Sequence, residues 1–242
     1  MKLPDSTPPH KTFRLSRHPS HNTLTYQKVG IKEAYDQWAA SYDSDPNATR
    51  DLDRDVTEKI AGTGQYRSVL ELGCGTGKNT RLFARISERV IAVDLSGEML
   101  AVAAGKHIHG TVHFAAVDLL QPWPFVSGWA DLISCNLVLE HIKELDPIFS
   151  RAYRTAAPGG RFFICELHPI RQYLGSQAQF TTAGSTQFIA AHVHHISDYL
   201  NSARRYGFHL LALDEWWHEK DHNKPPRLVS FMFEKSAPHE VE

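Results

Sequence analysis

The chain has few cysteines, no long apolar run and almost no excess of one charge. It contains 3 cysteines in 242 residues, an odd count that predicts reduced thiols in a cytoplasmic protein rather than a disulfide framework. No segment approaches the ~18 consecutive apolar residues of a membrane span, and the N-terminus lacks the apolar core of a secretion signal. We therefore expect no membrane partner.

The charges are nearly balanced. With 26 basic and 27 acidic residues, the formal net charge is -1, so no overall field draws the chain to nucleic acid. Its 42% hydrophobic and 22% charged residues are typical of a folded globular protein. The length is sufficient for one domain with a sizeable core.

Residues 1–30 differ in composition from the remainder. They contain four prolines and several basic residues but a single acid, Asp5. We predict a flexible N-terminal arm over 1–30 and one domain over 31–242. Alternatively, the arm packs over a binding site or against the second subunit of a homodimer.

The most informative stretch is VLELGCGTGKNTR, residues 69–81. A short apolar run, typical of a buried strand, ends in three alternating glycines, Gly73, Gly75 and Gly77. Residues 79–88 then show a helical pattern with apolar side chains on one side. A strand, a glycine turn and a helix form the start of a nucleotide-type βα unit.

Two nucleotide-binding motifs do not match this turn. A dinucleotide fingerprint needs its third glycine at position 78, which is Lys78. A phosphate-binding loop needs glycine where Leu72 stands and Ser or Thr where Asn79 stands. What remains is an acid, Glu71, two residues before three alternating glycines.

With this acid and these glycines, VLELGCGTG resembles the first motif of class I S-adenosylmethionine-dependent methyltransferases, a broad group that includes ubiquinone and menaquinone biosynthesis enzymes. The resemblance covers about residues 31–235 and is strongest over 69–141. It implies S-adenosylmethionine as cofactor and S-adenosylhomocysteine as product. The glycine turn, with Cys74, would face the methionine part of the cofactor.

An acid also ends the second predicted strand. Asp94 lies 19 residues after Gly75, close to the spacing at which a carboxylate reaches ribose hydroxyls. Alternatively, Asp94 caps the following helix, although Ser96 is placed to take that role. By resemblance, the adenine would contact Leu95, Met99, Asp118 and Leu119.

Other residues are assigned by resemblance near the methionine part. Tyr42, and with it Tyr35, lies in a helical pattern that would close over the cofactor. Asn136 would present its carbonyl to the cofactor's amino group. His141, predicted to begin a helix, is a candidate general base because imidazole titrates near neutrality. Alternatively, His141 orients the local backbone.

The order of the predicted elements sets the fold class. The predicted strands cover residues 69–72, 89–94, 112–118, 130–136, 161–167, 209–216 and 228–235. Most of them alternate with helical patterns, which predicts an α/β protein. The resemblance implies a Rossmann-like, seven-stranded sheet that is parallel except for the last strand, with helices on both faces.

An insertion, residues 168–196, separates the fifth strand from a late helix, and we expect it to form the lid that recognises the acceptor. The fold alone does not identify that acceptor. His192 and His195 in this segment are candidate catalytic bases. A metal site is another interpretation, but no complete ligand set is present, and the histidines could also be polar residues of the lid.

These observations predict methyl transfer to the oxygen, nitrogen or carbon of a small-molecule acceptor. One alternative is methylation of RNA or protein, which would require a basic face that this composition disfavours. Another is a regulatory or scaffold protein that binds S-adenosylmethionine without catalysis. Turnover with metabolites, turnover with RNA, and binding without turnover distinguish the three.

Overall fold

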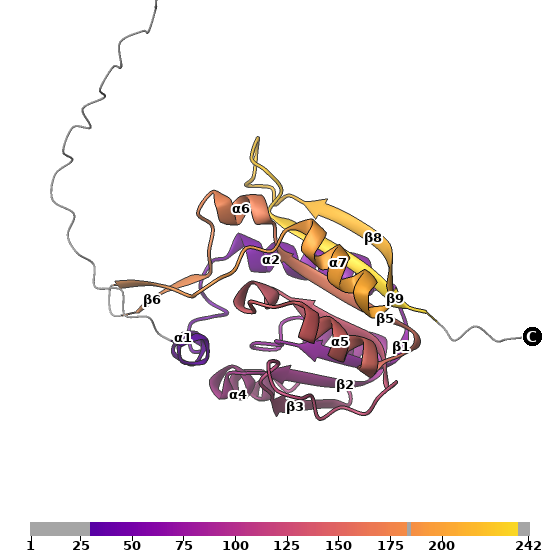
Figure 1. Ribbon diagram of the computed structural model, residues 1–242. Helices are drawn as coiled ribbons and strands as arrows, with labels where there is room; N and C mark the ends of the chain where they lie inside the picture. Colours follow the sequence, from indigo (N-terminus) through magenta and orange to yellow (C-terminus); the bar gives the residue numbers. More distant parts are fainter. Residues whose placement is uncertain (1–29, 183–184, 237–242) are drawn as a thin grey trace, which may run out of the picture.

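The computed structural model describes residues 30–182 and 185–236, so the predicted arm lies outside it apart from Gly30. A seven-stranded sheet forms its centre (Figure 1). In spatial order the strands are β3 (Val112–Ala116), β2 (Ser87–Asp94), β1 (Tyr66–Leu72), β4 (Ala130–Asn136), β5 (Ala156–Leu167), β9 (Leu228–Lys235) and β8 (Phe208–Trp216). Within the described ranges, no helix is long and apolar enough to cross a membrane.

The direction of the strands agrees with the predicted fold class. β1 pairs in parallel with β2 and β4, and the parallel pairing continues to β3 and β5. β9, the last strand of the described chain, lies between β5 and β8 and is antiparallel to both. The prediction of a seven-stranded sheet with an antiparallel last strand is therefore confirmed.

Helices cover both faces of the sheet. The helices of the described residues are α1 (Ile31–Trp38), α2 (Ala48–Ala61), α3 (Thr80–Ile86), α4 (Gly97–Gly105), the 3₁₀ helix η1 (Leu139–His141), α5 (Asp146–Thr155), α6 (Pro169–Tyr173) and α7 (Ile196–Tyr206). Side chains alternate between the faces of a strand, so Leu70 packs in the core with α5 and α7, whereas Val69 packs with α2 and α3. The central strands are thus buried on both sides, which explains their apolar sequences.

Several predicted boundaries are wrong by a few residues, and three of them have a clear physical reason or bear on the site. The helix predicted over 79–88 ends at Ile86, because Ser87 is extended and its hydroxyl donates to the carbonyl of Phe83. β5 begins at Ala156 rather than 161, since Gly159, with φ of 71°, accommodates a register shift beside β4. His141 ends η1 rather than beginning a helix.

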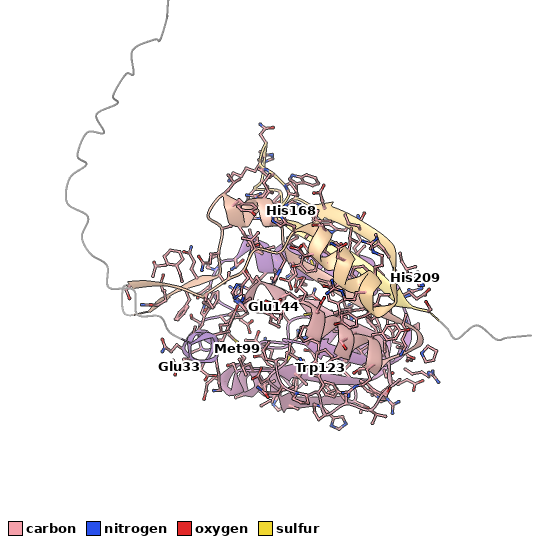
Figure 2. All side chains as sticks on the ribbon, in the orientation of Figure 1. Glu33, Met99, Trp123, Glu144, His168 and His209 are labelled. Carbon is pink, nitrogen blue, oxygen red and sulfur yellow. The ribbon has the colours of Figure 1, made fainter. Side chains whose placement is uncertain are left out.

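Part of the insertion folds as a hairpin beside α1. Its strands, β6 (Gln179–Thr182) and β7 (Ser185–Phe188), pair with each other outside the main sheet. Phe180 stacks on Trp38 of α1, with ring centroids 5.6 Å apart, and Figure 1 shows β6 and α1 at one end of the molecule. Met99, labelled in Figure 2, belongs to the same apolar cluster, whereas His209 lies at the opposite end.

Candidate functional site

A pocket lies at the carboxyl ends of β1, β2 and β4. Chain connections lead outward in opposite directions from β1 and β4, and such a switch point is where ligands bind in open α/β sheets. Eleven of the twelve residues predicted to contact the cofactor line this pocket: Tyr42, Glu71, Gly73, Cys74, Gly75, Asp94, Leu95, Met99, Asp118, Leu119 and Asn136. Gly77, the twelfth, does not. A Cβ at Gly77 would instead meet Ala103 and Ile108.

The glycine turn brings bare backbone to the pocket. Gly73 has a φ of 71°, and a Cβ there would overlap the Cγ2 methyl of Val138, so only glycine lets the segment after β4 approach. Gly75 has a φ of 52°, and a Cβ there would meet no atom within 4 Å. Gly73 is thus required by packing against Val138, and Gly75 leaves space beside the backbone.

Asp94 holds this turn against the end of β2. Its carboxylate oxygens accept hydrogen bonds from the backbone N–H groups of Gly75 and Ser96, both at 2.8 Å. Ser96 caps α4 by accepting from the N–H of Met99, so the prediction that Ser96 takes the cap is confirmed. Burial raises the pKa of Asp94. Each carboxylate oxygen keeps a lone pair for a further donor.

A buried polar layer supports the floor of the pocket. Glu71 accepts a 2.5 Å hydrogen bond from Thr80, and burial raises the pKa of Glu71 to about 8. Asp53 of α2 accepts from the side-chain amides of Asn79 and Asn136, at 2.9 and 2.7 Å. The side chain of Asn136 is therefore engaged in this layer. Asp53 was not predicted, because its place in an amphipathic helix gave no signal.

Arg50 is a second residue that the sequence did not reveal. Its guanidinium lies 3.9 Å from the ring centroid of Tyr42 and donates to the backbone carbonyls of Tyr42 and Asp45. It is 7% exposed and lines the pocket. Neither carbonyl is charged, so the arrangement leaves a desolvated cation ready to bind a ligand carboxylate. Burial raises the pKa of the Tyr42 phenol to about 12, so this ring is neutral.

Other residues that line the pocket have the features of a nucleoside site. Asp118, just past the end of β3, accepts from the N–H of Leu120 at 2.9 Å through one carboxylate oxygen. Met99 is 1% exposed and provides an apolar surface. A cationic end that would bind a carboxylate, bare backbone and two carboxylates thus match the parts of an amino acid joined to adenosine.

At the far end of the pocket, His141 is held between two segments. Its Nε2 lies 2.8 Å from the hydroxyl of Tyr35, and its Nδ1 lies 2.8 Å from the backbone carbonyl of Ala190 in the insertion. Both Tyr35 and His141 line the pocket. Burial lowers the pKa of His141, which favours the neutral imidazole.

The other two candidate bases lie elsewhere. His195 is exposed at the start of α7, where its Nε2 lies 3.0 Å from the hydroxyl of Tyr173. His192 lines a separate surface hollow next to α7. The structure thus does not bring His192 or His195 to the pocket that His141 lines. In the described residues, no three histidine, cysteine, aspartate or glutamate side chains could hold a metal ion.

Comparison with known proteins points to one family. A model of a methyltransferase domain matches residues 70–164. Over 221 residues, the chain is 31% identical to the uncharacterized methyltransferase AN0656 of Emericella nidulans, covering 75% of this chain and 77% of that protein. Over 139 residues, it is 32% identical to the malonyl-[acyl-carrier protein] O-methyltransferase of Serratia marcescens, covering 56% of this chain and only 52% of that relative.

A solved structure shares the fold. The DhpI–SAH complex matches with a TM-score of 0.63 at 21% identity, covering 87% of this chain and 98% of that chain. At this identity, the likeness extends to the architecture and not to the ligand contacts of individual residues.

Proposed function

The chain belongs to the class I S-adenosylmethionine-dependent methyltransferases, and from this premise we propose that it methylates a small-molecule acceptor. The observation that carries the proposal is the far end of the pocket, where Tyr35, His141 and Ile142 come together beside the insertion. A concave, partly apolar end with a few polar groups suits a small compound.

The pocket residues fit the cofactor part by part. Arg50 would bind its carboxylate, and the backbone at Gly73 and Gly75 would lie along its methionine part. Asp94 would accept hydrogen bonds from the ribose hydroxyls, and Asp118 from the adenine amino group. The bound cofactor supplies an electrophilic methyl group on a positively charged sulfur.

The protein's own contribution is chiefly positioning. Residues that fix an acceptor in line with a reactive group supply a large part of the lowering of the barrier. Of the three candidate bases, His141 is the one that the pocket contains, and its neutral imidazole would take a proton from the acceptor. Leu95, Leu119 and Met99 would complete the adenine contacts.

Calorimetry with S-adenosylmethionine and S-adenosylhomocysteine tests the cofactor assignment. Asp94→Ala should weaken binding by at least about tenfold, since hydrogen bonds to a charged group contribute roughly 1.5–3 kcal/mol. Asp214→Ala is the matched control, because Asp214 is exposed on β8 and does not line the pocket. Equal affinities in all three proteins would contradict the assignment.

Release of S-adenosylhomocysteine tests the acceptor class. The protein should turn over with a fraction of small metabolites and not with RNA or protein fractions. Turnover that depends on RNA or protein would replace the proposed acceptor class. Binding without turnover in any fraction would instead support a non-catalytic binding protein.

A further inference from the structure

The hydrogen bonds of His141 define which nitrogen carries its proton. The carbonyl of Ala190 can only accept, so Nδ1 must be the protonated nitrogen. In the neutral ring, Nε2 then has a free lone pair, and the hydroxyl of Tyr35 donates to it. The rings meet edge to face, with centroids 5.5 Å apart. The insertion therefore fixes the tautomer that turns a basic nitrogen toward Tyr35.

The surroundings keep both partners neutral. Burial lowers the pKa of His141 and raises the pKa of Tyr35 well above its usual range. The ionisable groups around Tyr35 are Tyr42, Glu140, Asp94 and Glu166, and each raises the pKa of this phenol further. The pair is thus a neutral donor and a neutral base, one hydrogen bond apart, at the wall of the pocket.

We propose that Tyr35 is a further catalytic residue, whose hydroxyl takes the proton of a neutral acceptor hydroxyl while passing its own proton to Nε2 of His141. This inference rests on the proposed function. The acceptor O–H bond breaks as its oxygen forms a bond to the methyl carbon. The methyl–sulfur bond breaks, and its electron pair stays on sulfur. The displaced proton ends on Nε2, giving an imidazolium that donates to Tyr35 and to Ala190.

The resulting imidazolium has a stabilising neighbour. Oε1 of Glu140 lies 3.9 Å from Nε2, and both side chains are largely buried. Burial raises the pKa of Glu140 to about 7, so this carboxyl group is partly ionised near neutrality. Its negative charge becomes more favourable as the positive charge on His141 develops.

The same charges select the class of acceptor. Of the two lysine or arginine side chains that line the described pocket, Arg50 would be occupied by the carboxylate of the cofactor, and Lys78 donates to Asp51 and to the carbonyl of Arg50. Beside the Tyr35–His141 pair, the partly ionised carboxyl group of Glu140 lies 3.9 Å from Nε2 of His141. A carboxylate acceptor would therefore be repelled, whereas a neutral alcohol or phenol would donate to Tyr35.

The chain contains a matched control pair outside the pocket. The hydroxyl of Tyr173 lies 3.0 Å from Nε2 of His195, but both side chains are exposed and their rings stack. Tyr173→Phe removes the same hydroxyl–imidazole hydrogen bond as Tyr35→Phe. Neither Tyr173 nor His195 lines the pocket that contains Tyr35.

The experiment compares acceptors of different acidity in the full-length protein. One set contains 4-ethylphenol and 2-phenylethanol, together with the carboxylic acids of the same skeletons. The second probe is 4-nitrophenol, which is a much stronger acid than 4-ethylphenol and therefore loses its proton with little help from a base. Turnover is measured for the wild type, Tyr35→Phe, His141→Asn and Tyr173→Phe. Asparagine keeps a donor toward Ala190 while removing the base.

We expect turnover of the hydroxy compounds and not of the matched acids. With 4-ethylphenol, Tyr35→Phe and His141→Asn should lose about 10²-fold or more in kcat, whereas with 4-nitrophenol they should lose less than about tenfold. The wild-type rate should fall as pH drops and His141 gains a proton, and this acid limb should disappear in His141→Asn. Tyr173→Phe should match the wild type.

Calorimetry on the same proteins distinguishes failure of the proposed function from failure of the inference about Tyr35. Failure of the wild type to bind S-adenosylmethionine would overturn the proposed function itself. With binding intact, turnover of the acids alone, or of neither class, overturns the inference. Equal losses of kcat with 4-ethylphenol and 4-nitrophenol in Tyr35→Phe also overturn the inference, since a merely structural role of Tyr35 would reduce both rates alike.

Discussion

The two ends of the pocket are built in different ways. At the proposed cofactor end, Gly73, Asp94 and Asp118 lie at or just past the tips of neighbouring strands, where the order of the sheet alone brings them together. At the proposed acceptor end, around His141, Tyr35 and Ala190 lie 106 and 49 residues from His141 in the sequence. The first end is thus determined by local motifs and the second by the packing of distant segments.

The largest expected effect is on the cofactor end. In Gly73→Ala, the new Cβ overlaps Val138, and the φ of 71° adds strain. Together these should cost roughly 3–5 kcal/mol of stability and abolish measurable cofactor binding. Chemical denaturation and calorimetry measure the two effects.

Gly128→Ala is the control for backbone strain. Gly128 has a φ of 69°, but a Cβ there would meet no atom within 4 Å. This variant should lose only about 1–2 kcal/mol and keep its cofactor affinity. If both variants lose the same stability, the close packing of Gly73 against Val138 does not add to the cost of backbone strain.

The next effect concerns the packing of the acceptor end. Trp38 is 4% exposed, stacks on Phe180 and donates to Asp45 at 2.7 Å. Trp38→Phe should cost about 2 kcal/mol and speed hydrogen exchange in α1 and β6, with β1 unchanged. Thermal unfolding and exchange measurements check both.

Trp217→Phe is the control for Trp38→Phe, because it makes the same substitution at an exposed position. Trp217 is 51% exposed and donates to the carbonyl of Lys224. It should cost less than about 0.5 kcal/mol, as most exposed substitutions do. If Trp38→Phe instead speeds hydrogen exchange throughout the main sheet, then α1 and β6 do not open independently of the sheet, and the prediction is wrong.

A smaller effect depends on pH and compares buried acids near the two ends. The pKa of Glu71 is raised from 4.5 to about 8 by burial, and that of Glu166 likewise. Between these values the folded protein holds protons that the unfolded chain has released. The stabilisation is therefore full below pH 4.5 and is lost as pH rises through 8. Glu71→Gln and Glu166→Gln should each flatten this decline.

Denaturation at a series of pH values between these limits tests the sign. The free energy of unfolding of the wild type should fall steadily with rising pH, and each variant should fall less steeply. A wild-type stability that rises over this range would show that both acids are ionised in the folded protein.

The smallest effect is expected for a partly exposed ion pair beside the pocket. Nζ of Lys106 lies 2.6 Å from Asp43, which also accepts from Thr76 of the glycine turn. Lys106→Gln should cost less than about 1 kcal/mol, with a smaller loss at high salt. Cofactor affinity should stay within about threefold of the wild type. A tenfold change in calorimetry would mean that this pair helps to hold the cofactor end.

The contrast between local motifs and the packing of distant segments explains which site residues could be predicted from the sequence. Gly73 and Asp94 were identified because their roles depend on neighbours at fixed spacing. Arg50 and Asp53 were missed because a charged residue on an amphipathic helix is ordinary until its tertiary partners are known. The sequence did not distinguish His141, His192 and His195 as candidate bases. Of the three, the fold places only His141 in the pocket. The domain boundary at residue 30 and the lid role of 168–196 stay predictions.

Ala190 contributes no functional side chain, yet its carbonyl has a consequence for engineering this protein. Grafting a different segment in place of residues 168–196 would remove the hydrogen bond that keeps the proton on Nδ1 of His141. The ring could then carry its proton on Nε2, and the nitrogen facing Tyr35 would no longer be basic. A chimera that exchanged substrate specificity by loop transplantation would therefore need a carbonyl restored at this one point.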